Sequence, residues 1–295
     1  MKILRITLTI ILVAAIFTGC KQKPGKEEKA EKTTKEKKPE LIHKWSTDSV
    51  LKIPESVCYD SARDVLYVSN IQGKPTEKDK DGFISKVSTD GKVLNLEWAI
   101  GLDAPKGMGI KGDKLYVTNV DEIVEIDIND YEITGTFPCE GSKFMNDIAI
   151  NEQGTVFASD MATGIIYRLK EGKVEKWIES EALKSPNGLF TENNQLLIGM
   201  KGKVMKADYL TGDLTEYISN TGGIDGLEKV EDGVYIKSDW AGHVHLLYPD
   251  KEKELILNTA GDKINAADIE FVPEKSMLYV PTFNDNRVMA YKLKH

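Results

Sequence analysis

Short runs of β-branched and aromatic residues recur along residues 41–295, separated by turns rich in Gly, Asn and Asp. The clearest run appears six times, as LYVSN at 66–70, LYVTN at 115–119, VFASD at 156–160, LLIGM at 196–200, VYIKSD at 234–239 and LYVPT at 278–282. Runs of this length and composition, bounded by turn residues, predict β-strands. The pattern therefore indicates an all-β domain built from repeats.

A shorter motif precedes each of these strands by nine to eleven residues: PESV, PKGM, MNDI, PNGL, IDGL and AADI. Its second residue is, in chain order, Glu55, Lys106, Asn146, Asn187, Asp225 and Ala267. A third run follows every strand, and most repeats have a fourth, such as KVEKW at 173–177, after a hairpin turn. A period of about 40 residues with four antiparallel strands is the signature of a β-propeller blade.

The sixth repeat ends at His295 after only three strands. A candidate for the missing outer strand is LIHKW at 41–45, which resembles KVEKW at 173–177. Joining the two ends of the domain in one blade would cover an otherwise open sheet edge. The sequence thus predicts a six-bladed β-propeller over residues 41–295, with the N-terminal strand closing the last blade.

The first twenty residues predict an export signal. Lys2 and Arg5 precede an apolar run over residues 6–17, which as a helix would span about 18 Å and not the roughly 30 Å of a bilayer core. The run therefore indicates a signal peptide over residues 1–19. The string FTGC resembles a bacterial lipobox and predicts a lipid on Cys20, the alternative being secretion without lipidation.

Residues 20–40 read as the lipidated cysteine followed by a charged, disordered tether. The whole chain carries a formal net charge of −8; residues 1–20 contribute +2 and residues 21–40 contribute +3, so residues 41–295 carry −13. An acidic domain argues against nucleic acid as a partner. We expect an exported monomer anchored by lipid on the periplasmic or cell-surface side of a bacterial membrane, with Cys58 and Cys139 as separate thiols.

Candidate chemistry lies at the second residue of the short motifs. In a propeller the innermost strands begin on the face where the second strands end, so these six residues should surround the axis on one face. Four carry a side-chain oxygen that can bind a cation: Glu55, Asn146, Asn187 and Asp225. Two carboxylates and two carboxamides suit calcium or another hard divalent cation, with positions left for water or substrate. The alternative is that Asn and Asp here only cap turns.

These motifs resemble the regucalcin, gluconolactonase and luciferin-regenerating group of six-bladed propellers. The resemblance covers most of residues 50–293 and is carried by PESVCYD, FMNDIAINEQG, SPNGL and IDGL. It implies that Glu55, Asn187 and Asp225 bind a divalent metal. Asn146 would contact the metal or the substrate, and Asp225 would also be the candidate general base.

The resemblance implies metal-assisted hydrolysis of a lactone or a similar ester, in which the cation polarises the carbonyl and Asp225 helps to activate water. Two departures concern the substrate. Phe144 stands where lactonases of the family commonly have an Arg that grips the sugar acid, and Pro54-Glu55-Ser56 replaces Gly-Glu-Gly. Specificity for sugar lactones therefore does not follow.

Three further features concern the rim of the predicted site. Lys106 would either meet an anionic substrate or pair with Glu55 or with acidic residues of the rim. Residues 71–82 form the one long insertion and are a candidate lid. Trp240 would be either a wall for a ligand or an aromatic packed between blades.

His243 and His245 fall on a third strand away from the axis, so we do not expect them to bind a metal.

Two functions from different classes remain open. The leading hypothesis is a calcium-dependent hydrolase of a small lactone or ester. The alternative is a non-catalytic, lipid-anchored propeller that binds a protein, peptide or glycan across its rim. Propellers serve both uses, so the fold alone does not decide between them.

Overall fold

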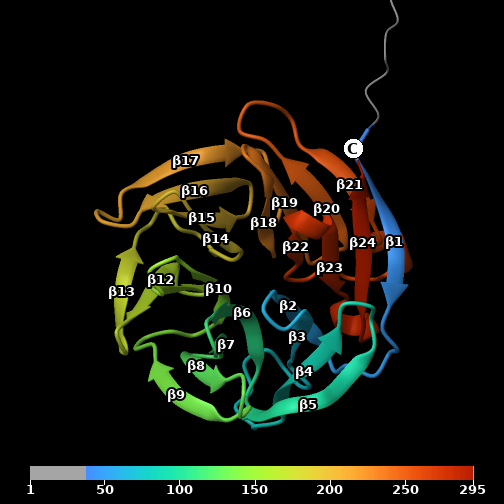
Figure 1. The fold of residues 1–295 in the computed structure, drawn as a ribbon. Helices are drawn as coiled ribbons and strands as arrows, with labels where there is room; N and C mark the ends of the chain where they lie inside the picture. Colours follow the sequence, from blue (N-terminus) through green and yellow to red (C-terminus); the bar gives the residue numbers. More distant parts are fainter. Residues whose placement is uncertain (1–37, 295) are drawn as a thin grey trace, which may run out of the picture. The chain divides into compact units, whose positions relative to one another are not determined.

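Six four-stranded antiparallel sheets are arranged around a common axis (Figure 1). The computed structural model describes residues 38–294. The predicted signal peptide, Cys20 and nearly all of the tether lie outside these residues. Each sheet corresponds to one predicted repeat, so the six-bladed β-propeller is confirmed.

In blades 1 to 5 the strands run from the axis outward in chain order, and in blade 6 the first strand of the chain is outermost. Blade 1 contains β2 (Pro54–Asp60), β3 (Val65–Asn70), β4 (Gly82–Ser88) and β5 (Val93–Leu102). Blade 2 contains β6 (Pro105–Lys111), β7 (Lys114–Asn119), β8 (Glu122–Asp127) and β9 (Ile133–Pro138). Blade 3 contains β10 (Met145–Ile150), β11 (Val156–Asp160), β12 (Ile165–Lys170) and β13 (Lys173–Glu179).

The remaining blades repeat this order. Blade 4 contains β14 (Leu189–Glu192), β15 (Gln195–Met200), β16 (Lys203–Asp208) and β17 (Leu214–Ser219). Blade 5 contains β18 (Leu227–Glu231), β19 (Val234–Asp239), β20 (His243–Leu247) and β21 (Glu254–Asn258). Blade 6 contains β22 (Glu270–Val272), β23 (Met277–Pro281), β24 (Val288–Lys294) and, outermost, β1 (Glu40–Ser46).

The predicted closure of the ring by the N-terminal strand is confirmed. β1 pairs antiparallel with β24, with Leu41 opposite Leu293 and Ile42 opposite Lys292. The Trp45 indole also donates a hydrogen bond to the Thr89 carbonyl oxygen of blade 1, at 3.0 Å. Blade 6 is therefore built from both ends of the domain, and the edge of β24 is covered.

The apolar core is divided among the blade interfaces. Each of the six largest buried clusters takes its residues from two neighbouring blades; between blades 1 and 2, Tyr67 and Trp98 pack with Val117. A single blade could not bury either of its faces alone. Cys58 and Cys139 belong to different clusters and are both free, which confirms the prediction of two separate thiols.

Helical structure within residues 38–294 is limited to three short 3-10 turns. They are η1 (Ala260–Asp262), η2 (Pro273–Lys275) and η3 (Phe283–Asp285). Across the same residues, no helix has the length and apolar character needed to cross a membrane.

Removal of β1 tests the closure. A chain that starts at Thr47 should lose at least roughly 10 °C in Tm, or aggregate, relative to one that starts at Lys38, because β24 becomes an unpaired edge and loses apolar contacts with β1. Thermal unfolding followed by circular dichroism measures this difference. Equal Tm values for the two chains would show that β1 does not stabilise the ring.

Candidate functional site

The axial register, which consists of the second residue of each of the six short motifs, is brought together at one end of the propeller axis. Glu55, Lys106 and Asn146 lie at the starts of β2, β6 and β10, whereas Asn187 and Asp225 immediately precede β14 and β18. These five side chains are buried and line one cavity of about 390 Å³. Ala267, the sixth, is fully buried and does not line it. The innermost strands surround the axis in Figure 1.

Several oxygens of this register have no hydrogen-bond partner. Within residues 38–294, the buried atoms Glu55 Oε2, Asn146 Oδ1 and Asn187 Oδ1 are all unpaired. A buried acceptor without a partner is costly, about 1–3 kcal/mol, and such atoms are rare in native proteins. Three of them, from three blades, line one cavity. The donor set and its unsatisfied oxygens fit a hard cation.

The turn-cap alternative does not account for these side chains. Asn187 Nδ2 donates to Asp225 Oδ1 at 2.8 Å, which links blades 4 and 5. Gly188 and Gly226, which follow these residues, have no left-handed backbone. They permit close approach instead, because a Cβ would lie 2.5 Å from the Asp225 carbonyl oxygen at Gly188 and 2.4 Å from the Ile269 amide nitrogen at Gly226. The glycines of SPNGL and IDGL thus bring the innermost strands together.

Burial and neighbouring charges shift the pKa values of the residues in the axial register. Burial raises the pKa of Glu55 well above its usual value, the negative charge of Asp225 raises it further, and Lys106 lowers it. Burial raises the pKa of Asp225 to about 6, against the hydrogen bond from Asn187. Burial lowers the pKa of Lys106 to about 8, although Glu55 favours the charged form. A bound cation would favour both carboxylates in their ionised forms.

The walls of the cavity are largely apolar. The ring centroid of Phe144 lies 4.9 Å from Lys106 Nζ. That nitrogen donates to the Ala104 carbonyl oxygen at 2.9 Å and forms no ion pair within 4 Å with a described carboxylate. The structure therefore does not contain the direct Lys106–Glu55 salt bridge that the sequence analysis gave as an alternative.

The insertion after β3 contributes to the same cavity. Ile71 and Pro75 line it, and the insertion is tied to blade 2 by ion pairs of Lys78 with Asp121 and of Lys80 with Asp103. Trp240 is 50% exposed, lines the cavity and contacts Phe283 edge to face, with ring centroids 5.6 Å apart. Trp240 is thus a half-exposed aromatic on the rim of the cavity that contacts Phe283 of blade 6.

Clusters of acidic, His and Cys side chains give no further metal centre. Across residues 38–294, no group of three or more His, Cys, Asp or Glu residues has the geometry to hold a metal ion. The axial set is of another kind, because half of its members are carboxamides. His243 and His245 do not line the cavity.

Sequence reasoning missed two buried carboxylates beside the axial register. Asp147 accepts hydrogen bonds from the backbone amides of Ile148 and of Leu189 in blade 4, both at 2.6 Å. Asp268 accepts one from Ser56 Oγ at 2.6 Å and joins blade 6 to blade 1. Burial raises the pKa of Asp147 to about 7. Asp147 directly follows Asn146 in MND, and Asp268 directly follows Ala267 in AAD. A comparison of this next position across the six repeats would have identified both carboxylates.

The cavity walls also include Met161, Ile224, Asp239 and Phe283, which sequence reasoning did not assign. Met161, Ile224 and Phe283 lie in the connections after second strands or before innermost strands, whereas Asp239 is the last residue of β19. These connections differ in length and composition from blade to blade, so the repeat gives no register for them.

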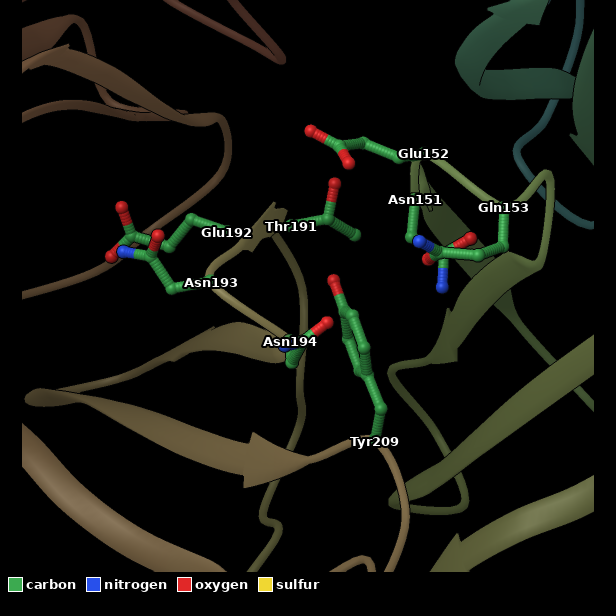
Figure 2. A pocket seen from close by; sticks show the side chains of 8 residues that line it. All are labelled: Asn151, Glu152, Gln153, Thr191, Glu192, Asn193, Asn194 and Tyr209. Carbon is green, nitrogen blue, oxygen red and sulfur yellow. The ribbon is translucent and has the colours of Figure 1, made fainter.

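A second hollow, of about 230 Å³, lies at the opposite ends of the strands, between blades 3 and 4 (Figure 2). It is lined by the turn residues Asn151, Glu152, Gln153, Thr191, Glu192, Asn193 and Asn194 and by Tyr209. Asn151 Oδ1 accepts from the Thr155 amide at 2.9 Å, and Tyr209 stacks on Phe157 with centroids 5.2 Å apart. These contacts are those of turns and interblade packing.

Comparison with solved structures supports the fold. A catalytically inactive virginiamycin B lyase from Staphylococcus aureus with quinupristin matches with a TM-score of 0.58 and 13% identity, over 87% of this chain and 99% of that one. A streptogramin B lyase matches with a TM-score of 0.61 and 13% identity, over 87% and 98%. These neighbours are six-bladed propellers, and at this identity they show the fold alone. No protein-family model and no curated protein sequence matches the chain.

The shifted pKa of Asp225 predicts an unusual stabilisation by mutation. Its usual pKa of 3.8 is raised to about 6, so the native state binds a proton more tightly and stability falls as pH rises between these values. Above about pH 6 the native state bears the full free-energy cost of holding Asp225 ionised in a buried site. At neutral pH without a cation, Asp225→Asn should therefore raise the free energy of unfolding by something on the order of 3 kcal/mol.

Urea unfolding in chelator, repeated from acid to neutral pH, measures this effect. The advantage of Asp225→Asn should shrink towards about pH 4. A variant less stable than wild type at neutral pH in chelator would contradict the electrostatic picture of the register.

Proposed function

We propose that the protein is a divalent-cation-dependent hydrolase of a small lactone or ester, with calcium as the cation and the axial cavity as the active site. The observation that carries this proposal is the convergence of three unpaired, buried acceptor oxygens on a cavity with two carboxylates. The solved neighbours include enzymes on the same fold, which is compatible with catalysis here.

The cation would be held by the four oxygen-bearing axial residues, Glu55, Asn146, Asn187 and Asp225. A bound dication supplies positive charge that polarises a carbonyl and stabilises developing negative charge. The Asn187–Asp225 hydrogen bond fixes the relative placement of two of these residues and leaves Asn187 Oδ1 available.

Lys106 would orient the substrate. Its ammonium group has three N–H donors, of which the Ala104 carbonyl oxygen takes one. The remaining donors can bind a carbonyl or carboxylate oxygen in the cavity. Because Lys106 is almost completely buried, such a bond would form in surroundings of low dielectric constant, where it is strong.

Asp225 would accept a hydrogen bond from the attacking water. With a cation beside it the pKa of this carboxyl is low, so its contribution is to orient the water and favour loss of its proton electrostatically. The apolar walls formed by Phe144, Ile71 and Met161 would limit the access of further water and accept the carbon skeleton of the substrate.

The predicted lipid on Cys20 would place this site outside the cytoplasm, on the periplasmic or cell-surface side of a membrane. The segment predicted as a tether, residues 20–40, would then link the lipid to the propeller, except that Glu40 already belongs to β1. This part of the proposal rests on the sequence alone.

Calcium titration of the chain starting at Lys38 tests the proposal. Calcium should raise the Tm and support hydrolysis of γ-butyrolactone or an aryl ester, and chelator should reverse both effects. Glu55→Gln should lose the shift and reduce kcat/KM by at least roughly 100-fold, because it removes a charged ligand. The exposed Glu97→Gln is the matched control and should behave as wild type.

Two results would decide against parts of the proposal. An equal calcium shift in wild type and Glu55→Gln would rule out the axial cation site. A shift lost in Glu55→Gln, with no turnover of any ester or lactone, would favour the non-catalytic binding module.

A further inference from the structure

The last residue of the second strand has a structural role in the first blades. In blade 2, Asn119 Oδ1 accepts hydrogen bonds from the Asp103 and Ala104 amides, at 2.8 and 3.1 Å. In blade 3, Asp160 Oδ2 accepts from the Lys143 and Phe144 amides. Each side chain thus holds the connection that leads to the axial residue, and neither lines the cavity.

Asp239 occupies the same position in blade 5 and behaves differently. It lines the cavity, and within the described residues its carboxylate accepts no bond from the connection that precedes Asp225. Its partners are Lys237 Nζ at 3.1 Å, His243 Nδ1 at 3.0 Å and the His243 amide at 3.3 Å. Lys237 Nζ holds the connection instead, by donating to the Gly223 carbonyl oxygen at 2.8 Å.

Lys237 stands at a place that is apolar in the other blades. The equivalent residues are Val68, Val117, Ala158, Ile198 and Val280. Its side chain is 0% exposed. A buried ion pair rarely stabilises a fold more than apolar residues of similar size would, so stability does not explain this exchange. Lys237 instead pairs with Asp239, whose side chain remains 18% exposed and lines the cavity.

Two aromatic side chains line the same cavity as this carboxylate. Trp240 follows Asp239 directly, half exposed, and Phe283 meets it edge to face; all three residues line the cavity. A carboxylate combined with aromatic rings is the chemistry that recognises an ammonium group, by charge and by cation–π attraction. Blade 5 lies opposite blade 2 in the ring of six (Figure 1), and Lys106 of blade 2 and Asp239 of blade 5 both line the cavity. Opposite blades therefore contribute an ammonium group and a carboxylate to the same cavity.

We propose that the substrate of this cavity carries an ammonium group, which binds Asp239 beside Trp240 while the scissile carbonyl faces the axial residues and Lys106. This specificity rests on the proposed hydrolase function. The substrate class is an amino lactone or an amino-acid ester. In its hydrolysis the water oxygen bonds to the carbonyl carbon, the acyl C–O bond breaks, one water proton goes to the leaving oxygen, and the other is released from the new carboxylic acid.

Matched lactones test the inference with the calcium-loaded protein. The probes are γ-butyrolactone and its α-amino and α-hydroxy derivatives, at a pH where the amine is protonated. Wild type should have a kcat/KM for the amino lactone roughly 10- to 100-fold above that for the unsubstituted ring. Asp239→Asn should reduce this ratio to about 3 or less, and Trp240→Ala should reduce it about 3- to 10-fold.

Glu97→Gln is the control, because it makes the same carboxylate-to-carboxamide change at an exposed residue that does not line the cavity and should retain the ratio. Asp239→Asn should keep the calcium-induced rise in Tm, which shows that the variant is folded and binds the cation. A hydroxy lactone preferred as strongly as the amino lactone, or a ratio unchanged in Asp239→Asn, would overturn the inference.

Binding separates this inference from the proposed function. If no lactone is hydrolysed, the hydrolase proposal fails. Calorimetric titration with the three lactones still tests recognition: tighter binding of the amino lactone in wild type but not in Asp239→Asn would support the ammonium site. Equal binding of all three lactones would overturn it.

Discussion

The close approach of the innermost strands at the axis is the constraint on which this structure depends. Without side chains at Gly188 and Gly226, backbones of neighbouring blades come into contact. Hydroxyl groups then join blade to blade: Thr118 Oγ1 donates to the Asn146 carbonyl oxygen, and Ser238 Oγ donates to the Ala267 carbonyl oxygen, both at 2.5 Å. The packing of the blades in the ring, and not flexible loops, therefore sets the positions of the axial side chains.

This geometry concentrates acidic groups where water is scarce. Glu55 and Asp225 lie in the axial register, with Asp147 and Asp268 beside them, and burial raises the pKa of all four. A protein without a use for these charges would lower its free energy by replacing them with apolar residues. A cation bound at the axis would compensate two of them, while backbone amides and Ser56 already stabilise the others.

Features that all six blades share and residues that differ from the repeat have different consequences in this structure. The strands that recur in all six blades bury the interblade clusters and set the shape of the ring. The polar residues of the candidate site lie where a blade departs from the repeat: carboxamides at two axial positions, Lys106 at a third, and Lys237 in place of an aliphatic residue. Each departure places a polar group in a buried position, and each is near the same cavity.

The sequence by itself determined the six blades, the closing strand and the five polar members of the axial register, because strand patterns and a repeat of about 40 residues are local signals. It did not determine which side chains meet across blades. Asp160 and Asp239 hold the same place in the repeat, yet one caps a connection and the other lines the cavity. Contacts such as Lys237–Gly223 decide that difference, and they form only after the blades have packed.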